Sequence, residues 1–346
     1  MEGVGKNLVA PLMGYPGLKL TGATVTQALQ DARTQFETLD ALGKAFSPDV
    51  LFLFMDLTAE AEALGARVAF SEGQPPSVVE HSPSLEEDLR RGRLLDPERE
   101  GRLPVFIRTM EEMKRHLDVA KGAYVTGPLT LAGELAGIKN VMKGMIKEDG
   151  FIRRLLEFTT KVAMEYARRL VDAGADILCI LEPSAALVSP RHYAQFSKAS
   201  IEEISNSVTA ITLLHICGDV APLIPEMIRT RVHGISVDSA VDIVEVFSQL
   251  DNGKAVAGNI DPIKEMVFST PEKIKERVVQ LRGKLRQYEK ALVSRCHPVV
   301  DEEDGFRQGL HSNFILSTGC DLPPEVPPEN ITAFMEGGRE SISHKT

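Results

Sequence analysis

The segment Thr212-Leu-Leu-His-Ile-Cys-Gly-Asp219 gives the clearest indication of the architecture. A short apolar run here leads directly into His215, Cys217 and Gly218, with no alternation of apolar and polar residues. Such a run is typical of a parallel strand that is buried on both faces. Gly218 then allows the chain to turn sharply away from the end of the strand.

Similar apolar runs recur on both sides of this stretch. Together with Thr212–Ile216 they predict strands at Leu8–Leu12, Val50–Phe54, Ala123–Thr126, Ile177–Leu181, Gly234–Val237, Ala255–Ala257 and Phe314–Leu316. Segments with helical spacing lie between them, such as Asp149–Ala173 and Ile263–Leu292, and Ser269-Thr-Pro-Glu is a helix start signal within the second. Alternating strands and helices indicate βαβ units, and eight strands favour an α/β fold of the closed (β/α)₈ TIM type.

Residues 67–103 interrupt this alternation. We expect a short hairpin there, a Gly73-Gln-Pro-Pro76 turn and the charged stretch Glu86–Glu100. The excursion is either a solvated loop or a lid or docking surface, and the sequence leaves both open. Without internal repeats or a low-complexity linker, we expect a single domain over residues 1–346, with a frayed tail after about residue 337.

Composition excludes several classes of function. The chain has 346 residues, 43% of them hydrophobic and 25% charged, which is ordinary for a globular protein. A net charge of −10 argues against a nucleic-acid partner. We find no signal peptide and no apolar run of about 18–20 residues, so we expect a cytoplasmic protein and no membrane span. Four cysteines in a chain of this length are not a disulfide framework.

One imidazole and two thiols form a candidate metal site. Residues two apart in a strand point to the same side, so His215 and Cys217 project together from the strand end where barrel active sites lie. Gly319-Cys320 follows the last apolar run, and Cys320 reaches the same rim if that strand closes the barrel. This nitrogen and sulfur set suits zinc. The residues alone also allow an ordinary core, because cysteine is among the most buried residue types.

Polar residues follow other predicted strands. Asp238 is our preferred fourth metal ligand, with Glu182 as the alternative. Asp56 is either a substrate-facing carboxylate or a helix N-cap, and Asn259 either donates to a ligand or caps the next helix. Gly127 either turns the chain or lets its backbone approach a flat ligand.

The remaining cysteines have different contexts. Cys179 lies within a predicted strand without polar neighbours, so we assign it to the core. Cys296 and His297 resemble a ligand pair, but they follow a helix on what should be the opposite side of the barrel. We therefore do not expect a metal site there.

The motifs together resemble a known family. They are His215-x-Cys217-Gly218, Gly258-Asn-x-Asp-Pro262 and Gly319-Cys320 with the prolines that follow. This combination resembles the uroporphyrinogen decarboxylase superfamily over roughly residues 40–336, and within it the corrinoid-dependent methyltransferases such as the methylcobamide:coenzyme M methyltransferases. The resemblance implies that His215, Cys217 and Cys320 bind zinc at the barrel mouth. Asp238 stands where the more distant zinc methionine synthases place a glutamate ligand.

The resemblance also implies an activity. A methyl group would pass between a methylcobalamin-type corrinoid on a partner protein and a small acceptor. A thiol such as coenzyme M would be deprotonated on the zinc, whereas tetrahydrofolate would need a carboxylate such as Glu182 or Asp56 at its N5.

Two alternatives remain: a metal-free porphyrinogen-type decarboxylase that uses Asp56, and a non-catalytic corrinoid-binding module with His215 as a cobalt ligand. Leu12–Lys19 contains no arginine, whereas the decarboxylases of the superfamily carry arginines near the N-terminus to hold porphyrin carboxylates. This difference counts against decarboxylation.

Overall fold

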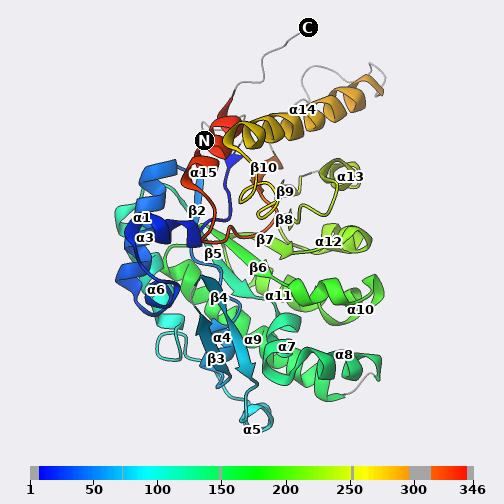
Figure 1. The fold of residues 1–346 in the computed structure, drawn as a ribbon. Helices are drawn as coiled ribbons and strands as arrows, with labels where there is room; N and C mark the ends of the chain where they lie inside the picture. The colour runs from blue at the N-terminus through cyan, green and yellow to red at the C-terminus, as the bar shows by residue number, and fades with distance from the viewer. Residues whose placement is uncertain (1–7, 72, 148–149, 251–252, 296–312, 341–346) are drawn as a thin grey trace.

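Eight parallel strands form the centre of the molecule, and helices surround them (Figure 1). The computed structural model describes residues 8–71, 73–147, 150–250, 253–295 and 313–340. The strands of the central sheet are β1 (Leu8–Val9), β2 (Val50–Phe52), β5 (Ala120–Thr126), β6 (Ile177–Leu181), β7 (Ile211–Ile216), β8 (Gly234–Val237), β9 (Ala255–Ile260) and β10 (Phe314–Thr318).

The sheet curls into a nearly closed barrel. Its strand order is β1-β10-β9-β8-β7-β6-β5-β2. From β5 to β10, each strand therefore pairs with the strand that precedes or follows it in the sequence. Asp49 bridges the remaining gap: its N–H donates to the Val9 carbonyl at 3.0 Å, and its Oδ2 accepts from the Val9 N–H at 2.7 Å. The predicted (β/α)₈ barrel is therefore confirmed.

All eight predicted strands are present, but several end elsewhere. β1 ends at Val9 instead of Leu12. The Leu12 N–H donates to the side-chain hydroxyl of Thr318 at 3.1 Å, and not to a backbone carbonyl of the neighbouring strand. β2 stops at Phe52, two residues early. β9 and β10 run two or three residues further than expected, to Ile260 and Thr318. Both extensions carry polar residues, Asn259 and Ser317, which an apolar pattern does not include.

Helices cover the outside of the barrel. They are α1 (Leu18–Thr21), α2 (Val25–Gln30), α3 (Ala32–Phe46), α4 (Ala59–Ala63), α5 (Leu85–Arg91), α6 (Leu103–His116), α7 (Pro128–Ala136), α8 (Ile138–Ile146), α9 (Gly150–Ala173), α10 (Pro190–Phe196), α11 (Lys198–Asn206), α12 (Ile224–Arg229), α13 (Ile243–Ser248), α14 (Pro271–Arg295) and α15 (Pro328–Arg339). Three short 3₁₀ turns join them: Tyr15–Gly17, Pro183–Leu187 and Ala221–Leu223. Among these helices, none combines the length and apolarity needed to cross a membrane.

Two helix boundaries differ from the prediction. The helix expected from Ile263 begins only at Pro271, because a proline suits a first helical turn while the residue before it disfavours helical backbone. α15 continues to Arg339, two residues past the point after which we expected a frayed tail, and that tail stays a prediction. Gly337 and Gly338 are buried in this helix. The backbone of Gly338 packs so closely on Leu316 and Val9 that a Cβ would lie 2.8 Å from each side chain.

The barrel interior has its own apolar cluster. Its buried members are Ala10, Leu12, Val50, Phe52, Tyr124, Ile177, Cys179, Leu181 and Leu213. Cys179 is only 1% exposed, so its assignment to the core is confirmed. Cys296 and His297 lie outside the described residues.

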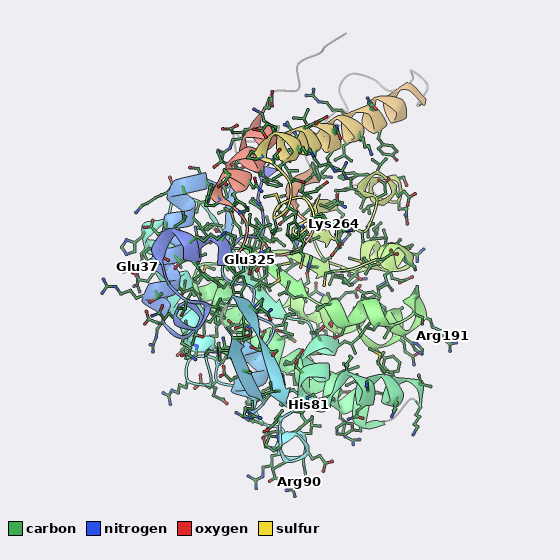
Figure 2. The ribbon with its side chains drawn as sticks, in the orientation of Figure 1. Glu37, His81, Arg90, Arg191, Lys264 and Glu325 are labelled. Atoms are coloured by element: carbon green, nitrogen blue, oxygen red, sulfur yellow. The ribbon has the colours of Figure 1, made fainter. Side chains whose placement is uncertain are left out.

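The excursion at residues 67–103 is a hairpin followed by a helix. The hairpin pairs β3 (Arg67–Ser71) with β4 (Gln74–Glu80) in antiparallel fashion, as predicted. The predicted turn was misplaced, because Gln74, Pro75 and Pro76 lie inside β4. A two-stranded ribbon tolerates these prolines, since both strands are edges. Figure 2 shows Arg90 of α5 at the outer tip of the excursion.

Arg102 attaches the end of the excursion to the barrel. Its side chain is 7% exposed, and its guanidinium forms ion pairs with Asp56, after β2, and with Glu62 of α4. It also donates to the Thr58 hydroxyl at 2.9 Å and lies 4.9 Å from the centre of the Phe70 ring. These contacts give this end of the excursion a structural role and bury the carboxylate of Asp56.

We predict that Arg102→Met lowers the free energy of unfolding by about 3–5 kcal/mol, because it leaves the Asp56 carboxylate buried without its charged partner. Urea denaturation monitored by circular dichroism would measure the loss. The matched control is Arg90→Met, which breaks an exposed pair with Glu87 and should change the same quantity by less than about 1 kcal/mol. Equal effects of the two substitutions would contradict the role given to Arg102.

Candidate metal centre

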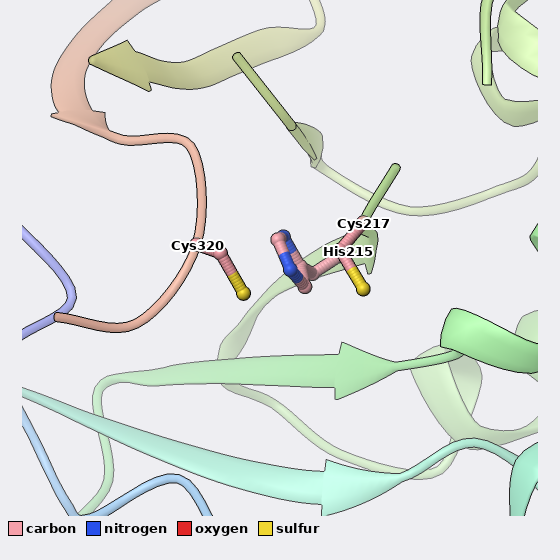
Figure 3. A group of neighbouring side chains, drawn as sticks. All are labelled: His215, Cys217 and Cys320. Atoms are coloured by element: carbon pink, nitrogen blue, oxygen red, sulfur yellow. The ribbon is translucent and has the colours of Figure 1, made fainter. Parts of the chain in front are cut away.

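His215, Cys217 and Cys320 meet at the mouth of the barrel (Figure 3). His215 lies near the end of β7, Cys217 follows that strand, and Cys320 comes from the loop after β10. One ligand atom from each residue lies within 4.8 Å of the other two. His215 is 2% exposed and the two cysteines are partly buried. The structure therefore places together the three residues that the sequence selected.

Two glycines allow these chain segments to meet. A Cβ on Gly319 would lie 2.4 Å from the backbone nitrogen of Ser239, so only glycine permits the loops after β8 and β10 to touch. The Gly319 N–H also donates to the Ile260 carbonyl at 2.7 Å. Gly218 has a φ of +93°, a conformation that favours glycine. Its N–H donates to Asp238 Oδ2 at 3.0 Å.

The imidazole of His215 is held by one nitrogen. Nδ1 lies 3.0 Å from the hydroxyl of Ser236 on β8, whereas Nε2 is buried and has no hydrogen-bond partner among the described residues. A buried polar atom without a partner costs about 1–3 kcal/mol. Metal-binding histidines commonly pair one ring nitrogen with the protein and give the other to the ion. The environment of His215 fits that pattern.

The two thiols share a hydrogen bond. The hydrogen bond with Cys320 lowers the pKa of Cys217 to about 5, and the nearby His215 acts in the same direction against the burial of the thiol. The pKa of Cys320 is raised well above its ordinary value, because the Cys217 sulfur holds its proton and the thiol is buried. One thiolate and one thiol therefore face the centre at neutral pH. Both sulfurs are available to a metal once the shared proton leaves.

The ligand set fits zinc. Tetrahedral zinc sites with one histidine nitrogen and two cysteine sulfurs retain a fourth position for water or substrate. One ring nitrogen of His215 and the two sulfurs lie within one 4.8 Å group, and Nε2 is the ring nitrogen that has no partner among the described residues. We therefore treat this cluster as the candidate metal centre.

Asp238 lies outside the group of three. Its Oδ2 accepts from the Gly218 N–H, and its Oδ1 accepts from the Ala240 N–H at 2.9 Å and the Ser239 hydroxyl at 3.2 Å. The side chain thus braces the turn that carries Cys217. Its assignment as a fourth ligand stays a prediction.

Glu182 and Gly127 contact each other. The buried Glu182 carboxylate accepts from the N–H groups of Leu129, at 3.1 Å, and Thr130, at 2.7 Å, in the first turn of α7. Burial raises the pKa of Glu182 to about 7, against the effect of these hydrogen bonds. A Cβ on Gly127 would lie 2.4 Å from Glu182 Oε2. The close approach at Gly127 is therefore made by Glu182, and roles for either residue toward a ligand stay predictions.

Asp56 and Asn259 also bind the protein itself. Asp56 Oδ1 accepts from the N–H and the hydroxyl of Thr58 at 2.8 and 2.7 Å. Thr58, not Asp56, is the residue at the N-cap of α4, so the N-cap interpretation of Asp56 was wrong by two residues. Asn259 Nδ2 donates to the carbonyls of Asp238 and Val241 at 3.0 and 2.7 Å, which holds the loop after β8. Neither contact tests a catalytic or cofactor-binding role.

Sequence reasoning missed several buried polar atoms that have no partner. The side-chain atoms Tyr124 OH, Ser317 Oγ and Asp321 Oδ1 are buried and have no hydrogen-bond partner among the described residues. A two-residue period would have placed Tyr124 and Ser317 inside the barrel, but no pattern in the sequence shows that a buried hydroxyl lacks a partner.

Comparisons with known proteins agree with this architecture. A profile of the uroporphyrinogen decarboxylase (URO-D) family matches residues 15–341. A methylcobamide:CoM methyltransferase of Methanosarcina barkeri is 28% identical over 95% of each chain, and a uroporphyrinogen decarboxylase of Nostoc punctiforme is 27% identical over 86% of this chain and 79% of its own. A solved methyltransferase structure from Methanosarcina mazei has a TM-score of 0.81 at 24% identity, covering 97% of this chain and 94% of that one. The family resemblance seen in the motifs is confirmed.

We predict that Cys217 reacts with iodoacetamide as a thiolate well below neutral pH. In metal-free Cys296→Ser protein, its alkylation rate should rise through a pH of about 5 and level off above it, because its pKa is lowered to about 5. Adding Cys320→Ser removes the sulfur partner and should move this inflection toward the ordinary thiol value of about 8.5. Peptide mass spectrometry after timed quenching would follow each cysteine, with the buried Cys179 as the unreactive internal control. An inflection that stays near 5 without Cys320 would contradict the shared hydrogen bond.

Proposed function

The chain belongs to the uroporphyrinogen decarboxylase family, and from that premise we propose that it is a zinc-dependent methyltransferase. It would move a methyl group between a methyl-corrinoid on a partner protein and a small thiol such as coenzyme M. The observation that carries this proposal is the convergence of His215, Cys217 and Cys320 within 4.8 Å at the barrel mouth. Relatives named as methylcobamide:CoM methyltransferases support the type of reaction. We include residues 1–346 in one barrel domain and propose a cytoplasmic location, where thiols stay reduced.

The residues of the centre would have distinct tasks. His215 Nε2 and the sulfurs of Cys217 and Cys320 would hold the ion, leaving one position for the acceptor. When bound, zinc supplies the positive charge that keeps an acceptor thiol deprotonated at neutral pH. Two cysteine thiolates offset the double charge of the ion, so the acceptor sulfur stays electron-rich.

The rest of the chain orients these groups. Ser236 fixes the imidazole ring at 3.0 Å, Asp238 braces the turn after Cys217, and Asn259 holds the loop against which Gly319 packs. Methyl transfer breaks a cobalt–carbon bond and forms a sulfur–carbon bond, with the electron pair of the broken bond left on cobalt and the thiol proton lost. Alignment of the two reactants is the main contribution required of the protein.

The contacts of the carboxylates favour a thiol over tetrahydrofolate. Glu182 and Asp56 are the groups we expected to act on N5 of a folate. Glu182 instead accepts hydrogen bonds from the first turn of α7, and Asp56 is paired with Arg102. With both groups engaged by the protein, we propose a thiol as the acceptor.

The same family contains porphyrinogen decarboxylases, but the N-terminal stretch supports methyl transfer. The residues from Leu12 to Leu18 are buried, and Lys19 is exposed. The Lys19 ammonium donates to the carbonyls of Glu325, at 2.7 Å, and Val326, at 3.2 Å. This stretch therefore offers the barrel mouth no cation for the carboxylates of a porphyrin.

The proposal is tested by metal analysis and a methyl-transfer assay. Purified protein should contain about one zinc per chain and should demethylate free methylcobalamin with coenzyme M, and not with tetrahydrofolate, as followed by corrinoid absorbance. Cys320→Ser should lower both zinc content and rate at least about tenfold, because even groups that only orient metal ligands contribute 10–100-fold. Cys179→Ala removes a cysteine away from the cluster and should leave both unchanged.

Three results would refute the proposal. Wild-type protein freed of metal could still transfer methyl groups at the full rate. Cys217→Ser protein could decarboxylate a porphyrinogen, which would favour a metal-free decarboxylase. Cobalamin could bind without transfer to coenzyme M, homocysteine or tetrahydrofolate, which would favour a binding module.

A further inference from the structure

The two cysteines of the candidate metal centre are also close enough to react with each other. The sulfurs of Cys217 and Cys320 lie within 4.8 Å of one another and share a hydrogen bond. Both cysteines are free and partly exposed, whereas Cys179 is buried in the interior cluster. Figure 3 shows the two side chains on separate chain segments that meet at the centre. Two neighbouring sulfurs are thus accessible to a small oxidant.

A disulfide between these cysteines requires only a small movement. A sulfur–sulfur bond is about 2.05 Å long, so sulfurs that start at most 4.8 Å apart must approach by less than about 3 Å. A shift of this size is within the reach of one loop and does not require the barrel strands to separate.

The turn that carries Cys217 can supply this movement. Cys217 directly follows the last residue of β7, so it lies outside the strand. A Cβ on the next residue, Gly218, would have no atom within 4 Å apart from its chain neighbours, which leaves open space beside the turn. The Gly218 N–H donates to a side chain, that of Asp238, and not to the backbone of another strand.

The loop that carries Cys320 is held more firmly. On one side of Cys320, the Gly319 N–H donates to the Ile260 carbonyl at 2.7 Å. On the other side, the Leu322 N–H donates to the Leu12 carbonyl at 2.8 Å. Backbone hydrogen bonds therefore fix this loop on both sides, and we expect Cys217 to move toward Cys320.

We propose that Cys217 and Cys320 form an oxidative modification site, at which a peroxide converts the two thiols to a disulfide. One sulfur attacks a peroxide oxygen, which breaks the oxygen–oxygen bond and gives a sulfenic acid and one water. The second sulfur attacks the sulfenic sulfur and forms the disulfide, and the hydroxyl that leaves takes the second thiol proton as water. Two thiols are oxidised, and one hydrogen peroxide is reduced to two waters.

The disulfide closes the centre to a metal ion. A cysteine binds zinc as a thiolate, so after oxidation only His215 remains of the three proposed ligands. Conversely, a bound ion occupies both sulfurs and slows their oxidation. This consequence rests on the proposed function, whereas the formation of the disulfide does not.

Oxidation of metal-free protein tests the pair. Cys296→Ser protein treated with hydrogen peroxide should lose about 2 Da, and dithiothreitol should restore the mass. Peptide mapping should find Cys217 linked to Cys320. Adding Cys320→Ser leaves Cys217 without a partner, so the protein should instead gain about 16 or 32 Da as sulfenic or sulfinic acid. The matched control, Cys179→Ala, should form the disulfide as its parent does.

Zinc binding tests the consequence. The disulfide form should bind zinc at least about tenfold more weakly than the reduced form, because even groups that only orient metal ligands contribute 10–100-fold. Competition with a zinc-binding dye would measure both affinities. Zinc-loaded protein should also form the disulfide more slowly than metal-free protein under the same peroxide.

The possible outcomes separate this inference from the proposed function. The oxidation site is overturned if peroxide produces no link between Cys217 and Cys320 in the metal-free parent protein. It is also overturned if the reduced protein binds zinc and the oxidised protein binds it equally well. A disulfide in a protein that binds zinc in neither state refutes the proposed function and leaves the oxidation site standing. Zinc binding and methyl transfer without any disulfide overturn the oxidation site alone.

Discussion

The close approach of Gly319 to the backbone of Ser239 is the contact on which the candidate centre depends. It brings the loop after β10 against the loop after β8, at a separation that no side chain at residue 319 could occupy. Cys320 is consequently next to Cys217, which arrives from β7 through the left-handed turn at Gly218. Parallel strands make this possible, because all their carboxyl ends lie at one rim. Residues more than a hundred positions apart can then present their atoms to the same small volume.

The polar groups at the carboxyl ends of the barrel strands are of two kinds. Some are engaged in contacts within the protein, and others are available to bind a ligand. Asp56 forms an ion pair with Arg102. Glu182 accepts a hydrogen bond from the first turn of α7, and Asp238 accepts one from the Gly218 N–H. Each of these carboxylates follows a strand or a strand-end loop, yet each is engaged by the protein. The centre is different, since His215 Nε2 has no hydrogen-bond partner among the described residues and the sulfurs of Cys217 and Cys320 interact with each other. That contrast directs the chemistry toward a metal and a thiol more than toward carboxylate acid–base catalysis.

The sequence predicted the barrel well, because strands buried on both faces leave unmistakable apolar runs such as Ile177–Leu181. It also placed His215 and Cys217 on one side through the two-residue period of a strand. It could not identify Arg102 as the partner of Asp56, since this pair joins residues 46 positions apart through an irregular excursion. The hydrogen bonds of Glu182 and the partnerless hydroxyl of Tyr124 were equally hidden, because both depend on how side chains meet in three dimensions. The observed end of β1 differs from the predicted one where the side chain of Thr318, and not the backbone of the neighbouring strand, accepts the hydrogen bond.

The central claim is that His215, Cys217 and Cys320 bind one zinc ion together. X-ray absorption spectroscopy at the zinc edge, on the purified zinc-loaded protein, tests this claim most directly. We expect two sulfur neighbours at about 2.3 Å and a histidine nitrogen at about 2.0–2.1 Å, and one sulfur fewer after either Cys217→Ser or Cys320→Ser. A first shell of nitrogen and oxygen alone, or a spectrum unchanged by both substitutions, would contradict a centre built from these three residues.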